Sequence, residues 1–467
     1  MLFNTTQFFV FFTVVLALFY AAPRSWPRVP RVILLVASYY FYLSWNYKFV
    51  VLLLGLTVVD FGAAIAIEQA QAGRKKLFLL ISLIANLGML GVFKYYNFFA
   101  DNLAQLLRYP PHAWTYSIIL PLGISFHTFQ SISYVVDVYR GEQAAIRNPI
   151  DYALFISFFP QLVAGPIVRA REFFGDLYAW KHPNQEEVLR GVLLIVLGLA
   201  KKMAFADQFA QIADSYFQNL HLHPGGFAAW SGVFAFAMQI FFDFSGYTDI
   251  AIGLALLLGF HFPVNFRRPY LAFSMTDFWH RWHMSLSRWL RDYLYIPLGG
   301  NRHGRLMTYR NLMLTMLLGG LWHGASWNFV IWGGYHGGLL SLERMMGRRE
   351  FEKRPPLWLY PLRAAITFGL VCVGWVFFRA ATFADSRYVI SQLFHSGKQM
   401  DALIPKWLMY MTGASLLIAV IEERFAWTER LSRGPAWAYA AFVIALLLTI
   451  ELIGVTEKAL PFVYFQF

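Results

Sequence analysis

Long apolar runs joined by short basic links constrain this chain more than any other feature. Of its 467 residues, 58% are hydrophobic and only 14% are charged, whereas about a quarter of the residues in a soluble domain are charged. The mean hydropathy is +0.48. Such runs predict an all-α polytopic membrane protein. Because no internal repeat, low-complexity tract or soluble segment stands out, we expect one membrane-embedded domain over residues 1–467.

The basic clusters predict the topology. Arg24, Arg28 and Arg31 follow the first apolar run, and a second cluster covers residues 74–76. Positive residues favour the cytoplasmic side, so the N-terminus is expected to lie outside. The N-terminus lacks the positive leader of a cleavable signal peptide, and the first run is therefore expected to remain as a helix. The pattern predicts roughly eleven spans with re-entrant or interfacial helices.

Two segments are too polar or too irregular for ordinary lipid-facing spans. Ser117–Val138 is expected to cross the membrane while facing other helices or a cavity, because it carries His127, Gln130 and several hydroxyl groups. Tyr152–Ile167 has basic flanks and two prolines, which favours a re-entrant segment. Asp243 and Asp249 lie in another apolar region and are interpreted as helix-packing or orienting groups.

The net charge and the cysteine content exclude other classes. The formal net charge of +13 comes from loops between apolar runs, which is typical of a membrane protein and argues against nucleic-acid binding. Cys372, the single cysteine, lies in an apolar run and cannot form an intramolecular disulfide. It is interpreted as a buried structural thiol.

Asp277–Tyr295 is the first of two histidine-bearing segments on which the functional interpretation depends. A helix over this range, with Asp277 as its N-cap, places His280 and His283 on one face. Arg281, Arg288 and Arg291 add positive charge. We expect an interfacial helix lining a basic cytoplasmic funnel that attracts an anionic donor such as a nucleotide-linked acyl thioester.

Gly319–Asn328 is the second segment, and it contains His323. Its small neighbours let another backbone or a thin acyl chain approach the imidazole. A neutral histidine at this depth is a suitable general base for a hydroxyl nucleophile, and a protonated one stabilises a tetrahedral intermediate. His283 would orient His323, bind the donor carbonyl or relay a proton. The predicted catalytic residues are His323 and His283, and the predicted substrate-binding residues are Arg281, Trp282, Ser285, Arg288, Trp322, Ser326 and Asn328.

Structural alternatives stand beside these assignments. For His280 and His336 a structural hydrogen bond is the favoured interpretation, and the arginines also suit cytoplasmic anchors. Histidines at positions 280, 283, 323 and 336 are compatible in type with zinc, copper or haem iron. No cysteine or His–carboxylate spacing completes such a site, so no metal is expected. A proton-coupled transporter or polymer exporter, and a non-catalytic scaffold, remain alternative functions.

Several longer motifs resemble one family over nearly the whole chain. They are Pro121–Tyr134 (PLGISFHTFQSISY), Phe159–Pro166 (FPQLVAGP), Phe242–Gly253 (FDFSGYTDIAIG), Phe278–Arg302 (FWHRWHMSLSRWLRDYLYIPLGGNR) and Gly319–Gly324 (GGLWHG). The chain resembles the membrane-bound O-acyltransferase family, in the bacterial branch of the alginate O-acetyltransferase membrane subunit. The family's near-invariant histidine maps onto His323, and a second functional position maps onto His283.

The resemblance implies further expectations. They are a funnel-like fold in the bacterial inner membrane, acetyl-CoA as a donor substrate with no bound cofactor, and a periplasmic SGNH-type acetyltransferase or polysaccharide-modification subunit as partner. The polymer is expected to be cellulose, alginate or a similar exopolysaccharide, with peptidoglycan as the alternative. The chain is shorter than expected of an alginate subunit, which favours cellulose or another glycan.

Overall fold

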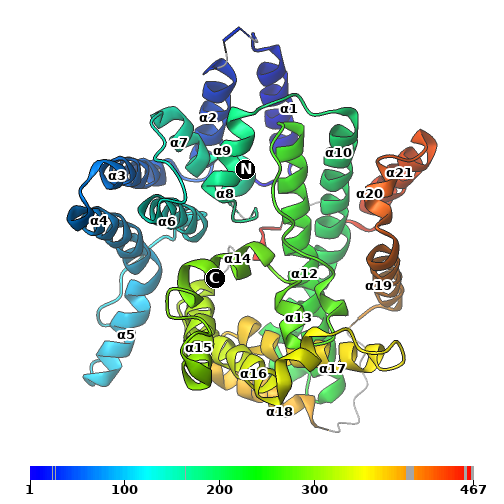
Figure 1. Ribbon diagram of the computed structural model, residues 1–467. Coiled ribbons are helices and arrows are strands. Elements are labelled where there is room, and N and C mark those ends of the chain that lie inside the picture. The colour runs from blue at the N-terminus through cyan, green and yellow to red at the C-terminus, as the bar shows by residue number, and fades with distance from the viewer. Residues whose placement is uncertain (24, 27, 164, 396–403, 457–459, 464–467) are drawn as a thin grey trace. The chain divides into compact units, whose positions relative to one another are not determined.

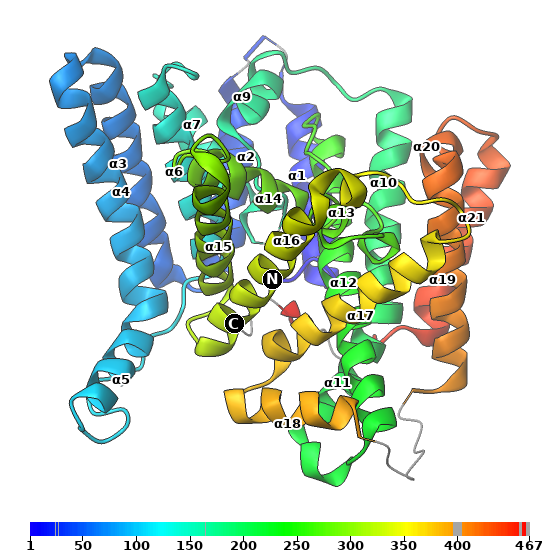
Figure 2. The same cartoon turned by 60° about the horizontal axis from the view of Figure 1, so that its bottom comes forward.

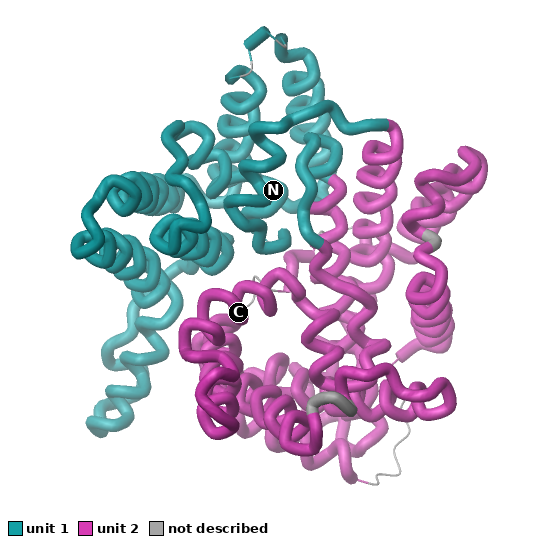
Figure 3. Tube along the Cα trace, viewed as in Figure 1, with its two compact units in different colours: residues 1–184, 254–263 teal, residues 185–253, 264–467 magenta. Residues whose placement is uncertain are grey.

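The structure, a computed structural model, describes residues 1–23, 25–26, 28–163, 165–395, 404–456 and 460–463. Arg24 of the first basic cluster lies outside the described residues. The described part is helical, with no β-strand, as predicted (Figure 1). The chain divides into two compact units, residues 1–184 with 254–263 (unit 1) and residues 185–253 with 264–467 (unit 2) (Figure 3). The single-domain hypothesis stays a prediction.

Membrane-spanning character is visible in the described helices. Five of them are long and apolar enough to cross a bilayer, namely Tyr47–Gln69, Ala72–Leu106, Gly226–Leu257, Tyr360–Arg379 and Ala436–Ile453. A spanning helix needs about 20 mostly apolar residues, and Thr6–Ala21 is a shorter apolar helix. These helices support an integral membrane protein, whereas the count of about eleven spans stays a prediction.

Unit 1 is built from helices of the N-terminal part of the chain. They are α1 (Thr6–Ala21), α2 (Arg28–Leu43), η1 (Tyr47–Phe49), α3 (Val50–Gln69), α4 (Ala72–Leu90), η2 (Gly91–Tyr95), α5 (Tyr96–Leu106), α6 (Ile124–Arg140), α7 (Pro149–Ser157), α8 (Phe159–Leu162) and α9 (Ala170–Tyr178). Helices α3 and α4 lie side by side, and α4 continues through the π-turn η2 into α5 (Figure 2). Buried Asp60 of α3 accepts hydrogen bonds from Ser82 (2.6 Å) and Asn86 (2.9 Å) of α4. These bonds offset the cost of burying a carboxylate between apolar helices.

The structure can be compared with two sequence predictions for unit 1, at Ser117–Val138 and at Tyr152–Ile167. The predicted helix over Ser117–Val138 is wrong at its start, because α6 begins only at Ile124. Gly123 precedes it at φ 69°, and a Cβ there would lie 2.3 Å from the carbonyl oxygen of Leu162, so only glycine fits this close approach. Within the range Tyr152–Ile167 the backbone breaks at Phe158, between the short helices α7 and α8, whereas the re-entrant course of this segment stays a prediction.

Unit 2 contains the remaining helices. They are α10 (Gln185–Ala200), η3 (Lys201–Ala206), α11 (Asp207–Gln218), η4 (Leu220–Leu222), α12 (Gly226–Leu257, whose last turn belongs to unit 1), η5 (Pro269–Leu271), α13 (Met275–Trp279), α14 (Met284–Leu290), η6 (Arg291–Tyr295), α15 (Gly304–His323), α16 (Trp327–Glu352), α17 (Tyr360–Arg379), α18 (Phe383–Leu393), α19 (Lys406–Phe425), α20 (Trp427–Leu431) and α21 (Ala436–Ile453). The apolar region that carries Asp243 and Asp249 forms one continuous helix, α12.

Helices α10 and α12 approach closely through glycines. A Cβ on Gly198 would lie 2.4 Å from the carbonyl oxygen of Gly246, and one on Gly253 would lie 2.5 Å from that of Gly191. Contacts between small residues of this kind let backbones pack closely in membrane helices. The crossing brings α12 next to the lysines that follow α10.

Both carboxylates of α12 have a lysine partner on the π-turn η3. Lys201 lies 2.6 Å from Asp249, and buried Lys202 lies 2.8 Å from Asp243. The other Asp243 oxygen accepts a hydrogen bond of 2.6 Å from the backbone of Val463. The charges are therefore paired, as burial requires, and they fasten the C-terminal segment to α12, in agreement with a packing role for Asp243 and Asp249.

Candidate active site

The first histidine segment is not a single helix, and the prediction of one over Asp277–Tyr295 is wrong. The segment forms α13, a turn, α14 and the π-turn η6. Ser274, not Asp277, is the N-cap of α13, with its hydroxyl accepting the Asp277 N–H at 3.0 Å. The turn removes the expected common face of His280 and His283. His280 is exposed and His283 is fully buried.

The break occurs at His283, which adopts the left-handed conformation (φ 43°, ψ 54°). A non-glycine residue pays about 1–2 kcal/mol for this conformation. Two backbone hydrogen bonds from an earlier segment stabilise the turn. The Met284 N–H donates to the carbonyl of Asn265 at 2.9 Å, and the Arg267 N–H donates to that of Arg281 at 2.9 Å. The turn is thus held by residues far away in sequence.

The imidazole of His283 lies in an apolar site with a single polar contact. Its Nδ1 is 3.1 Å from Oδ1 of Asn265, and its ring meets Phe244 edge-on at 4.7 Å between ring centres. Nε2 is buried and has no hydrogen-bond partner among the described residues. Burial lowers the pKa of His283 to about 3. The imidazole is therefore neutral at physiological pH.

His323 is positioned by local helical structure. It is the last residue of α15 and is 5% exposed. Its ring packs against Trp322, Trp332 and Phe378, with ring centres 4.9, 5.1 and 5.2 Å away. An aromatic cage on several sides fixes the imidazole at the point where the helix ends.

Glycines around His323 serve the packing of α15 against α16. A Cβ on Gly320 would lie 2.2 Å from the carbonyl oxygen of Phe329, and one on Gly324 would lie 2.1 Å from the ring of Phe329. The backbone of α16 therefore approaches α15 closely at Gly320, and the ring of Phe329 lies beside Gly324. The predicted approach of a backbone or an acyl chain to the imidazole of His323 stays a prediction.

The structure brings His283 and His323 together around one tryptophan. Trp322 lies 6.2 Å from His283 and 4.9 Å from His323, measured between ring centres. The two imidazoles therefore lie no farther apart than the sum of these separations. Both belong to unit 2, in α15 and at the start of α14. This arrangement places the neutral imidazole of His283 in the same aromatic cluster as His323.

Two of the predicted substrate-binding residues, Trp282 and Ser285, are buried near His283. Trp282 is 1% exposed and packs against Phe266 and Trp375 at 5.0 Å. Ser285 is buried and donates from both its backbone and its hydroxyl to Asn265, at 3.1 and 2.9 Å. Trp282 and Ser285 thus contact Phe266 and Asn265, which are themselves neighbours of the His283 ring, whereas Trp322 packs against that ring directly.

Other predicted substrate-binding residues have different contacts. Asn328 donates through its amide to the carbonyl of Ala380 at 2.9 Å, and the Ser326 N–H donates to Gly324. Arg281 pairs with Asp277 at 2.8 Å and with Glu423 at 3.1 Å. Ion pairs thus take up part of the positive charge expected to line a funnel.

Arg288 and Arg291 are the other two arginines that were expected to line the basic funnel. Arg291 pairs with Asp292 at 2.6 Å, while Arg288 is half-buried on α14. Roles of Arg281 and Arg288 in donor binding stay predictions.

His336 is fully buried and packs against Trp332, which also contacts His323. Its ring centre lies 4.8 Å from that of Trp332 and 5.3 Å from that of Trp279, and neither ring nitrogen has a partner among the described residues. A Cβ on Gly374 would lie 2.7 Å from its Nε2. No group of three or more potential metal ligands of the His, Cys, Asp and Glu types occurs in the described part of the chain.

Asn265 is the site residue that the sequence interpretation missed. It is fully buried and contacts His283, Met284 and Ser285 through its side-chain and backbone oxygens. Asparagine does not titrate, and Asn265 lies before two arginines that are more conspicuous in the sequence. A polar amide in the otherwise apolar stretch Phe262–Phe266 was the available signal.

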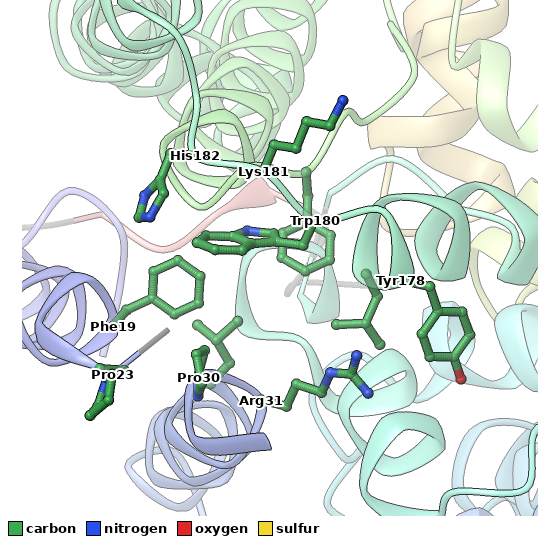
Figure 4. A pocket seen from close by; sticks show the side chains of 12 residues that line it. Phe19, Pro23, Pro30, Arg31, Tyr178, Trp180, Lys181 and His182 are labelled. Atoms are coloured by element: carbon green, nitrogen blue, oxygen red, sulfur yellow. The ribbon is translucent and has the colours of Figure 1, made fainter. Parts of the chain in front are cut away.

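A separate cavity of about 370 Å³ lies within unit 1 (Figure 4). Phe19, Pro30, Arg31 and Trp180 are among its lining residues. The guanidinium of Arg31 pairs with buried Asp151 at 3.0 Å, which matches its charge locally. None of the predicted site residues lines this cavity, so it is not part of the predicted reaction centre.

Comparisons with known proteins agree with the motifs that carry the two histidines. A model described as the membrane-bound O-acyltransferase family matches residues 142–383. The chain is 43% identical to the probable alginate O-acetylase of Pseudomonas aeruginosa, over 91% of this chain and 81% of the relative. It is 40% identical to the peptidoglycan O-acetyltransferase of Helicobacter pylori, over 84% of this chain and 79% of the relative.

A more distant relative extends the comparison to another acyl group. The teichoic acid D-alanyltransferase of Bacillus subtilis is 30% identical, over 61% of this chain and 75% of the relative. The region matched by the family model, residues 142–383, includes both histidines and the helices α13 to α17 around them. The chain is an O-acyltransferase and belongs to the membrane-bound O-acyltransferase family.

Proposed function

We propose that this protein moves acetyl groups from cytoplasmic acetyl-CoA across the membrane for O-acetylation of an exported polysaccharide. The observation that carries the proposal is the pair His283 and His323, which share Trp322 as a neighbour in the matched family region. Acetyl as the acyl group is supported by the names of the alginate and peptidoglycan relatives. A transporter gains no support from these relatives.

His323 is the general base in this proposal. Its imidazole takes the proton of an acceptor hydroxyl, whose oxygen attacks the thioester carbonyl of the donor. The new C–O bond forms as the C–S bond breaks, and the thiol of CoA leaves with a proton. His283 assists by holding the donor carbonyl or by passing on the proton. The surrounding aromatic residues exclude water, which would otherwise hydrolyse the thioester.

The cellular arrangement is part of the same proposal. We propose that the protein lies in the bacterial inner membrane, with a periplasmic N-terminus and roughly eleven spans arranged as a funnel. Arg281 and Arg288 attract the anionic donor, and the acetyl group passes directly to the polymer or to a periplasmic SGNH-type acetyltransferase. The basic segments of the sequence support a cytoplasmic donor side.

An acetyl-ester assay on the exported polymer tests this function. Cells carrying His323→Ala at normal protein levels are expected to export polymer without acetyl esters. His112→Ala, which changes an exposed histidine of unit 1, is the matched control and is expected to leave acetylation unchanged. Retained acetylation in the His323→Ala strain contradicts the assignment.

Peptidoglycan is the second candidate acceptor, because its O-acetyltransferase in Helicobacter pylori is nearly as similar as the alginate relative. Acetyl esters measured separately on purified peptidoglycan and on exopolysaccharide distinguish the two. Loss of esters from peptidoglycan alone in the His323→Ala strain selects this candidate over an exopolysaccharide.

A further inference from the structure

Asn265 contacts the His283 turn through both its side chain and its backbone. Its Oδ1 lies 3.1 Å from the backbone nitrogen of Ser285, 2.9 Å from the Ser285 hydroxyl and 3.1 Å from Nδ1 of His283. Its backbone oxygen accepts the N–H of Met284 at 2.9 Å. One buried residue therefore binds three consecutive residues of the turn.

The identity of the Asn265 side-chain atoms follows from one of these contacts. A backbone N–H can only donate, so the atom facing the Ser285 N–H must be the amide oxygen and not the NH₂ group. This excludes the flipped orientation of the amide, which would place two donors against each other. An amide oxygen can only accept.

The tautomer of His283 follows in turn. Since Oδ1 of Asn265 only accepts, Nδ1 of His283 must carry the proton and donate it. In a neutral imidazole the other nitrogen then has a free lone pair. That nitrogen, Nε2, is buried and has no hydrogen-bond partner among the described residues.

We propose that Asn265 is a positioning residue that holds His283 in the Nδ1–H tautomer and so presents the lone pair of Nε2 to a reacting or binding group. It also holds the left-handed turn at His283 through its bond to Met284. His283 therefore acts as a hydrogen-bond acceptor at Nε2, which suits a bond from a hydroxyl or N–H group and excludes holding the donor carbonyl, the first of the two uses proposed for His283 above. This inference deepens the proposed function and rests on it, since the tautomer affects catalysis only if acyl transfer occurs here.

Three variants and a matched control separate positioning from packing. Asn265→Asp keeps an oxygen in the same place, while Asn265→Leu keeps the approximate size and removes the acceptor. His283→Asn removes the His283 imidazole, so comparing its ¹⁵N spectrum with that of the wild type identifies the signals of His283. The control is Asn311→Ala, because Asn311 is an equally buried asparagine of unit 2 whose amide donates to the carbonyl of Gly300 at 2.9 Å.

The primary measurement is the ¹⁵N spectrum of histidine side chains in purified, ¹⁵N-histidine-labelled protein. The wild type and Asn265→Asp are expected to show the Nδ1–H tautomer of His283, and Asn265→Leu is expected to lose that preference. Asn311→Ala is expected to lower the melting temperature and leave the tautomer unchanged. An Nε2–H tautomer in the wild type overturns the proposal, whether or not the leucine variant folds.

Acyl-transfer kinetics provide the second measurement. Removing the partner that orients a metal-binding histidine typically costs 10–100-fold, and Asn265→Leu is expected to lose kcat on the same order with little change in KM. Asn265→Asp is expected to stay within a few-fold of the wild type. An unchanged kcat in a folded Asn265→Leu variant overturns the positioning role. If the tautomer is as stated but His323→Ala transfers acetyl at the wild-type rate, the proposed function fails and the tautomer assignment stands.

Discussion

The two histidines of the candidate site are held in place by different kinds of structure. His323 lies where a regular helix ends, and neighbours in α15, α16 and α17 hold it. His283 lies in a left-handed turn that breaks a potential helix, held by Asn265 from 18 residues earlier. The first position depends on the packing of helices against each other. The second depends on a few hydrogen bonds.

This difference fits the different tasks that we propose for the two residues. A ring enclosed by tryptophans and a phenylalanine is rigid and shielded from water, which suits the base of the reaction. A ring with a fixed tautomer and an unpartnered buried nitrogen suits an assisting group. The variants below alter one arrangement at a time.

The largest expected effect is on His323. His323→Gln keeps a polar side chain of similar length but removes the base, so the rate of acyl transfer by the purified protein is expected to fall about 10²–10⁴-fold. Thermal unfolding in detergent checks that the variant folds. A fall of less than about tenfold in a folded variant is incompatible with His323 as the general base.

A smaller loss of rate is expected at His283. Asparagine adopts the left-handed conformation readily, so His283→Asn should keep the turn and nearly the wild-type melting temperature while the rate falls about 10–100-fold. His283→Ala removes the ring at a position where its backbone is strained, and it should also lower the melting temperature. Equal stability of the two variants would argue against strain at this turn.

The close packing of α15 on α16 predicts a stability effect next to His323. Gly320→Ala places a Cβ against the backbone oxygen of Phe329, so the free energy of unfolding is expected to fall by about 1–3 kcal/mol. Gly338 of α16 has no atom within 4 Å of an added Cβ, and Gly338→Ala should be neutral or slightly stabilising. Melting temperatures of the two variants measure the difference.

The pH dependence of stability tests the burial of His283. Its folded-state pKa of about 3 lies below the unfolded value of about 6.5. Between these values the unfolded state binds more protons, so stability is lost as the pH falls below about 6.5. At pH 5 this residue contributes a loss of about 2 kcal/mol relative to neutral pH. The free energy of unfolding of His283→Asn should therefore fall less between pH 7 and pH 5 than that of the wild type. An equal fall in both proteins would show that His283 is not buried as described.

The sequence predicted the helical class and the segments that bear both histidines. The end of α15 at His323 follows from local glycines and an apolar run. The turn at His283 could not be predicted from periodicity, because residues 277–295 contain no glycine or proline and the cause of the break is the distant Asn265. At Ser117–Leu122 a local signal was present, since Pro121 and Gly123 disfavour a helix before Ile124, where α6 begins.

The central claim is that His283 and His323 act in one reaction centre, and the double variant tests it most directly. Transfer of labelled acetyl from acetyl-CoA would be measured for the purified wild type, His323→Gln, His283→Asn and the combination. Residues that act as a unit are strongly non-additive. The double variant is therefore expected to be about as slow as His323→Gln alone, whereas losses that multiply would contradict a shared centre.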